Sequence, residues 1–289
     1  MKLYYNKLGS DSKGMRRQQP LFIVHGLFGM SDNWLTVGKK LAENFEVYLL
    51  DLRNFGQSLH SDAWTYPAMA KDIQETMDDV LGLMANGKNT STIKHQPLPI
   101  LIGHSLGGKV AMQFASLFPQ MLEKLIVVDI APKDLHPKVF DFVNLLPAID
   151  LSKMKSRKEV ETELGKILKE NSIIQLLLKN IQWTPHPQSL STEERSSSQR
   201  LDWKFNLKAI VNNMNMIGDT FKLKEKIETP TLFIRAENSD YILEEDIPSI
   251  KKTFPNSEFK TIAGAGHWVH ADKPVEFAET IREFTSLES

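Results

Sequence analysis

Gly103-His104-Ser105-Leu106-Gly107-Gly108 stands between the apolar run Leu98-Pro99-Ile100-Leu101-Ile102 and a segment, 110–118, whose apolar residues recur at helical spacing. This order predicts a strand, a tight turn with Ser105 at its apex, and a helix. Strand and helix approach so closely in such a turn that Gly103 and Gly107 have no room for a side chain. The turn exposes the Ser105 hydroxyl at a helix N-terminus, where a developing negative charge is favoured. Ser105 is therefore a candidate nucleophile.

Short apolar runs alternate with helical segments on both sides of this turn, which predicts a mostly parallel sheet covered by helices on both faces. The expected strands are 2–8, 21–25, 45–51, 98–104, 124–130, 231–235 and 258–262. The expected helices between them include 33–43, 66–85, 107–118 and 274–287. The predicted fold class is therefore α/β.

The alternation stops between residues 133 and 228, where the sequence has helical segments but no strand signal. The helices expected there are 138–146, 156–169, 173–182 and 207–217. We interpret 133–228 as an inserted, all-helical lid, and 1–132 with 229–289 as the core domain. The polar segments 86–95 and 189–199 are expected to be surface loops.

Composition excludes several classes of protein. The 289 residues include 41% hydrophobic residues and carry a formal net charge of −1, with no basic cluster, which argues against a nucleic-acid partner. The absence of cysteine excludes disulfides, thiol catalysis and cysteine-bound zinc. No apolar run reaches the ~18 residues of a membrane span, and the first residues do not resemble a secretion signal. A cytoplasmic protein is expected, with no prediction of its oligomeric state.

A serine nucleophile needs a base, and His267 is the best candidate. It stands in Gly264-Ala265-Gly266-His267-Trp268, between the last expected strand and the last expected helix. There it can reach over the edge of the sheet, and the glycines permit a close approach. His270 is an alternative if the loop is shifted, His104 is expected to point away from the nucleophile, and the remaining loop histidines at 60, 95, 136 and 186 are expected at the surface.

The base in turn needs an acid, for which the sequence offers two candidates. Asp129 ends an expected strand, where catalytic groups of parallel sheets collect. Asp240 lies in the loop Ala236-Glu237-Asn238-Ser239-Asp240, which carries the acid in many hydrolases of this plan. The usual position of that acid is occupied here by Ser239, so we favour Asp129 and keep Asp240 as the alternative.

The tetrahedral intermediate of such a reaction needs N–H donors for its oxyanion. The N–H of Leu106, next after the nucleophile, is one candidate. The second is the N–H of Leu27 in His25-Gly26-Leu27-Phe28-Gly29, which follows another expected strand. A further turn, residues 51–58, is interpreted as a scaffold with buried polar contacts.

These motifs together resemble the α/β-hydrolase superfamily over nearly the whole chain. The residues that carry the resemblance are His25-Gly26-Leu27-Phe28-Gly29, Asp51-x-Arg53-Asn54-x-Gly56-x-Ser58, Gly103-His104-Ser105-Leu106-Gly107-Gly108-Lys109, Val128-Asp129-Ile130-Ala131-Pro132 and Ala265-Gly266-His267-Trp268-Val269-His270. Within the superfamily they resemble small bacterial esterases of acyl esters and acyl-CoA thioesters, mitochondrial abhydrolase-domain hydrolases and yeast ethanol acetyltransferases. Phe55 stands where these relatives usually have histidine.

The resemblance implies a serine hydrolase that cleaves short- to medium-chain carboxylic esters or acyl-CoA thioesters through an acyl-enzyme, with the acid at Asp129. It implies no metal and no organic cofactor. Phe28 and Trp268 are the candidate substrate-binding residues of the core, joined by lid residues that could equally form the lid's own core. Two alternatives are an alcohol acyltransferase with the same triad and, less favoured, a non-catalytic binding protein.

Overall fold

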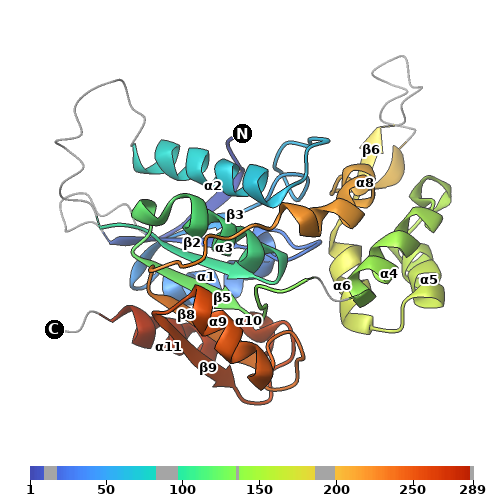
Figure 1. Cartoon of the computed structure of the whole chain (residues 1–289). Coiled ribbons are helices and arrows are strands. Elements are labelled where there is room, and N and C mark those ends of the chain that lie inside the picture. Colours follow the sequence, from blue (N-terminus) through green and yellow to red (C-terminus); the bar gives the residue numbers. More distant parts are fainter. Residues whose placement is uncertain (10–17, 83–96, 135–136, 186–198, 287–289) are drawn as a thin grey trace.

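A mostly parallel sheet forms the centre of the molecule (Figure 1). The structure, a computed structural model, describes residues 1–9, 18–82, 97–134, 137–185 and 199–286. Within these ranges, seven strands pair in the order β1-β3-β2-β4-β5-β8-β9. Their bounds are β1 Tyr5–Leu8, β2 Gln19–Val24, β3 Phe45–Leu50, β4 Ile100–His104, β5 Lys124–Val128, β8 Thr231–Ala236 and β9 Ser257–Ile262. The pair β1–β3 is antiparallel and the other pairs are parallel, so the predicted fold class is confirmed.

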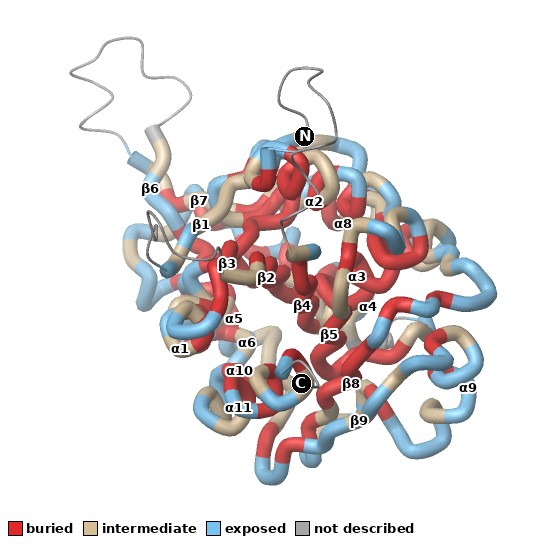
Figure 2. Tube along the Cα trace, turned by 90° about the vertical axis from the view of Figure 1, so that its left-hand side faces the viewer, coloured by how far each residue is buried: buried red, intermediate tan, exposed pale blue. Residues whose placement is uncertain are grey.

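Helices cover both faces of this sheet because its strands are apolar on both sides. One face packs against α2 (Tyr66–Leu81), α3 (Leu106–Leu117) and α9 (Ile247–Thr253). The other packs against α1 (Leu35–Leu41), α10 (Val269–Asp272) and α11 (Pro274–Thr285). Successive residues of a strand point to opposite faces, so Phe22 belongs to the first core and Leu21 to the second. Figure 2 shows the inner strands β2, β3, β4 and β5 as mostly buried, whereas the edge strands β1 and β9 are more exposed.

Some helices begin or end at other residues than expected, because capping residues and turns determine their ends. Helix α2 begins after Thr65, whose hydroxyl accepts the Ala68 N–H, and ends at Leu81, just before Gly82, where φ is +70°. The expected helix 33–43 is divided into a 3₁₀ turn, Ser31–Trp34, and α1. The helices α9 and α10 are absent from the sequence-based prediction, because each is too short for a periodic signal.

The lid leaves the core after β5 and returns before β8 (Figure 1). Its helices are α4 (Pro137–Leu145), α5 (Arg157–Ile167), α6 (Asn171–Lys179) and α8 (Leu207–Ile217), close to the predicted ranges. The expectation of an all-helical lid is wrong, because β6 (Ile181–Pro185) and β7 (Gln199–Trp203) pair antiparallel. Ile181, Leu201 and Trp203 of this hairpin are buried. Five-residue strands separated by a polar stretch give too weak an alternation to be recognised in the sequence.

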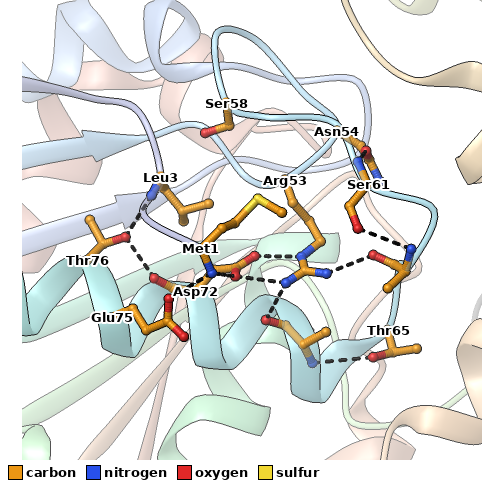
Figure 3. Close-up of polar contacts among 12 residues, drawn as sticks. Met1, Leu3, Arg53, Asn54, Ser58, Ser61, Thr65, Asp72, Glu75 and Thr76 are labelled. Atoms are coloured by element: carbon orange, nitrogen blue, oxygen red, sulfur yellow. Dashed lines mark hydrogen bonds and ion pairs between the residues drawn. The ribbon is translucent and has the colours of Figure 1, made fainter.

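The turn at residues 51–58 has the predicted scaffold role (Figure 3). Its Arg53 guanidinium binds both carboxylate oxygens of Asp72 on α2, at 2.5 and 2.7 Å, and both side chains are buried. Asp51 accepts the Ser31 N–H at 2.6 Å, and the Ser58 hydroxyl donates to the Asp51 carbonyl at 2.6 Å. The turn thus holds α2 and the loop after β2 in place. The expected surface loop at 86–95, and 189–199 except for Gln199, lie outside the described residues.

Candidate active site

Ser105 lies between the last residue of β4 and the first residue of α3, with φ +52° and ψ −118°. This left-handed conformation is costly for a residue with a side chain and is typical of functional sites. A Cβ at Gly103 would collide with the Gly107 carbonyl, and one at Gly107 would collide with the carbonyls of Val24 and His25. The predicted need for glycine on both sides of Ser105 is confirmed.

His267 and Asp129 are paired. Nδ1 of His267 lies 2.8 Å from Oδ2 of Asp129, whose side chain is buried. The carboxylate can only accept, so Nδ1 carries the proton and Nε2 is left as a base. Asp129 follows β5 directly with φ +48°, and its Oδ1 accepts the Ala236 N–H at 3.1 Å. The competing candidate Asp240 is exposed at the rim of the cavity described below.

Two residues beside this pair were not recognised in the sequence. The Ser239 hydroxyl donates to the same Oδ2 of Asp129 at 2.5 Å. The Tyr241 ring stacks on the His267 imidazole, with centroids 4.1 Å apart and an angle of 19°. Burial, with Asp240 and Asp129 nearby, raises the pKa of Tyr241 to about 12, so its hydroxyl is neutral. Ser239 occupies the position where many hydrolases of this plan carry an acid, which was the available signal for it.

Two other histidines near the site, His104 and His270, make structural contacts. Nε2 of His104 lies 2.8 Å from the His267 carbonyl, so His104 fastens the loop that carries His267. His270 stacks on Trp34 at 3.8 Å, and its buried Nδ1 has no hydrogen-bond partner among the described residues. Burial lowers the pKa of His270 to about 3 and, with His267 and His270 nearby, also lowers that of His104. His60 is exposed as predicted, whereas 95, 136 and 186 lie outside the described residues.

The two candidate oxyanion donors are the backbone N–H groups of Leu106 and Leu27. Leu106 is the first residue of α3, so its N–H has no acceptor within the helix. The Leu27 N–H donates to no backbone acceptor in the described part of the chain. Leu27 precedes Phe28, which has φ +57°, and Gly29, whose N–H donates to the Gly26 carbonyl at 2.9 Å. Leu27, Leu106 and Ser105 all line the same cavity.

This cavity, of about 1200 Å³, lies between the core and the lid and has largely apolar walls. Both predicted substrate-binding residues, Phe28 and Trp268, line it. Its other apolar lining side chains include, from the core, Leu27, Trp64, Ile130 and Tyr241 and, from the lid, Val139, Phe142, Leu145, Ile167, Leu168, Ile173, Leu176 and Met214. The Phe28 ring itself is fully buried among Phe55, Phe142 and Phe205.

The described residues include no group of three or more His, Cys, Asp or Glu side chains placed to hold a metal ion. None of the helices in the described ranges is both long and apolar enough to cross a membrane. A cytoplasmic location stays a prediction.

Comparisons with known proteins agree with this architecture. A sequence model of the alpha/beta hydrolase family matches residues 21–280. An sn-1-specific diacylglycerol lipase, ABHD11 of Danio rerio, is 34% identical over 282 residues, covering 95% of this chain and 80% of the relative. A probable alcohol acetyltransferase of Saccharomyces cerevisiae is 33% identical over 287 residues, covering 96% and 79%. The solved structure of a marine microorganism esterase superposes with a TM-score of 0.81 at 35% identity, covering 98% of this chain and 99% of the other.

Proposed function

Because this chain belongs to the alpha/beta hydrolase family, we propose that it is a serine esterase whose triad is Ser105, His267 and Asp129. The observation that carries the proposal is the Asp129–His267 contact of 2.8 Å, together with the cavity that both His267 and Ser105 line. A buried carboxylate that accepts from Nδ1 leaves Nε2 of the imidazole as the base for a serine hydroxyl.

The reaction would follow the acyl-enzyme sequence. The Ser105 oxygen attacks the ester carbonyl while its proton passes to Nε2 of His267. The resulting oxyanion binds the N–H groups of Leu27 and Leu106. Collapse of this intermediate breaks the bond to the alcohol, which leaves with the proton from His267. Water, activated by the same imidazole, then releases the acid and restores Ser105.

Charges at the cavity favour an uncharged ester over an acyl-CoA thioester. The charged side chains that line it among the described residues are the carboxylates Asp141, Glu170, Asp240 and Asp272 and the lysines Lys169 and Lys179. All six are exposed, and the acids outnumber the lysines by two to one. Coenzyme A is polyanionic, so this excess of negative charge disfavours its approach. The neutral walls suit an acyl chain, and the relative from Danio rerio is named for a neutral lipid substrate.

An alcohol acyltransferase is the second candidate, supported by the relative from yeast. It would use the same acyl-enzyme, with an alcohol in place of water in the second step. The two functions differ only in which acceptor reaches the acyl-enzyme, so one assay can distinguish them.

The test combines active-site labelling with a substrate panel. A fluorophosphonate probe should label the wild type and Ser249→Ala, an exposed control, but not Ser105→Ala. Esters of p-nitrophenol and acyl-CoAs of increasing chain length are then compared at low and high salt, with and without ethanol. We expect faster ester turnover, a salt-dependent gain with acyl-CoA only, and free acid as the main product. An unlabelled wild type would overturn the proposal, and ethyl ester as the main product would favour the acyltransferase.

A further inference from the structure

Asn180, directly after lid helix α6, is linked to the loop that carries the Leu27 N–H, and we propose that it is a positioning residue of the oxyanion hole. The inference rests on the proposed function, since it requires that Leu27 bind the oxyanion. It makes the lid part of the catalytic arrangement as well as a wall of the cavity.

The Asn180 side chain bridges the lid and the core. It is fully buried, and its Nδ2 donates to the Phe28 carbonyl at 2.7 Å and to the Leu176 carbonyl at 3.0 Å. Both partners are carbonyl oxygens, so the nitrogen of the amide must face them. The Lys204 N–H donates to the carbonyl of Asn180 at 2.7 Å, which ties its backbone to the end of the lid hairpin.

Two peptide groups link the Asn180 side chain to the N–H of Leu27. The group that joins Phe28 and Gly29 accepts from Asn180, and its N–H donates to the Gly26 carbonyl at 2.9 Å. That carbonyl belongs to the group that joins Gly26 and Leu27. The described chain has no cis peptide bonds, so the N–H of each group points opposite to its carbonyl. The direction of the Leu27 N–H is therefore set by hydrogen bonds that begin at Asn180.

The loop needs such a contact because its backbone is strained. Phe28 has φ +57°, a region that residues with a Cβ occupy at a cost in free energy. Such conformations persist where the surroundings impose them. The lid holds the Phe28 carbonyl through Asn180, and it holds the ring through Phe142 and Phe205, at centroid distances of 5.3 and 4.5 Å. Without the Asn180 contact, the turn can relax and the Leu27 N–H can rotate away from the oxyanion.

The lid contains a matched control. Asn213 on α8 makes the same two kinds of contact: its Nδ2 donates to the carbonyl of Ala209, four residues earlier, at 2.8 Å, and to the carbonyl of Asp62 in the core at 3.0 Å. Neither Asn213 nor Asp62 is among the described residues that line the cavity. Replacing Asn213 therefore removes a link between lid and core without touching the loop of Leu27.

The experiment compares Asn180→Ser and Asn180→Leu with Asn213→Ser and Asn213→Leu. A serine at 180 can still bond the Leu176 carbonyl but is too short for Phe28, so it keeps the helix end. For each variant, kcat and KM are measured with a p-nitrophenyl ester, together with the inhibition constant of a trifluoromethyl ketone, whose serine adduct carries an oxyanion. Thermal unfolding verifies that each variant is folded. If Asn180→Leu does not fold, Asn180→Ser alone tests the proposal.

We expect kcat of both Asn180 variants to fall roughly 10- to 100-fold, somewhat less than on loss of a direct donor, with KM within about 2-fold of wild type. The inhibition constant of the ketone should rise by the same factor as kcat falls. The Asn213 variants should change neither quantity more than about 2-fold. An unchanged kcat, a loss confined to KM, or an equal loss in the Asn213 variants would overturn the role of Asn180. A wild type that neither hydrolyses esters nor binds the ketone would instead overturn the proposed function.

Discussion

Asp129 shows how the position of one carboxyl group determines the orientation of a neighbouring histidine. It follows a parallel strand, is buried, and accepts from Ala236, Ser239 and His267. Asp240 lies in the loop after the neighbouring strand β8, and its side chain is exposed at the rim of the cavity. A buried carboxylate held by three donors fixes the orientation of its histidine.

Replacing the two carboxyls should therefore have very different results. Asp129→Asn removes the acceptor that fixes the tautomer of His267, and we expect kcat with a p-nitrophenyl ester to fall on the order of 10⁴-fold. Asp240→Asn, the matched control, should lose far less. The reverse ranking in steady-state kinetics would transfer the role of the acid to Asp240.

Helix α3 does more than present Ser105, because side chains along it contact both connections to the lid. Lys109 donates to the Lys133 carbonyl on the outgoing connection and lies 4.6 Å from the centre of the Phe221 ring on the returning one. Burial lowers the pKa of Lys109 to about 8. One turn further, Gln113 bonds both the carbonyl and the N–H of Lys222, at 3.0 and 3.1 Å. Helix α3 thus links Ser105 to the segments from which the lid extends.

Gln113→Ala should destabilise the protein, because it removes the two hydrogen bonds that the buried Gln113 side chain makes with the backbone of Lys222. We expect the free energy of unfolding, measured by urea denaturation, to fall by about 1–3 kcal/mol. Gln182→Ala, at an exposed position of the lid, should stay within about 0.5 kcal/mol of wild type. Equal losses in the two variants would show that the contact with Lys222 contributes nothing specific.

Across the molecule, the buried histidines link stability to pH. Burial holds the pKa of both His104 and His270 below that of a histidine in an unfolded chain. Below about pH 6.5 the unfolded chain therefore binds protons that the folded protein does not, and stability falls as pH falls. For His270 this loss continues until pH approaches about 3.

The variant His270→Phe tests this linkage. Phenylalanine can keep the stacking on Trp34, has no group to protonate, and removes the Nδ1 for which the described part of the chain offers no hydrogen-bond partner. We expect the dependence of unfolding free energy on pH, between 6.5 and 4, to become shallower by up to about 1.4 kcal/mol per pH unit. Phe277→Leu, in the same cluster, should lower stability equally at each pH. A slope unchanged in His270→Phe would contradict a neutral, buried His270.

The local pattern of the sequence was sufficient to predict the strands of the central sheet and the turn at Ser105. These features depend on short-range rules: apolar runs form buried strands, and glycine is required where backbones approach closely. Gly103 and Gly107 are the clearest case, since their role is fixed by neighbours within a few residues. The lid hairpin was missed because its two strands are short and separated in sequence.

Contacts between residues far apart in the sequence could be identified only in the folded structure. The partner of His267, the Ser239 hydroxyl on Asp129 and the bridge from Asn180 to Phe28 join residues more than 100 positions apart. No periodic pattern in the sequence predicts such pairs, because their geometry depends on the order of the strands in the sheet and on where the lid packs. The sequence makes Ser105 the candidate nucleophile and His267 the candidate base, and it leaves two candidate acids. The sheet brings Asp129 to His267, and the lid holds the loop of Leu27, because both depend on packing between elements rather than on neighbouring residues.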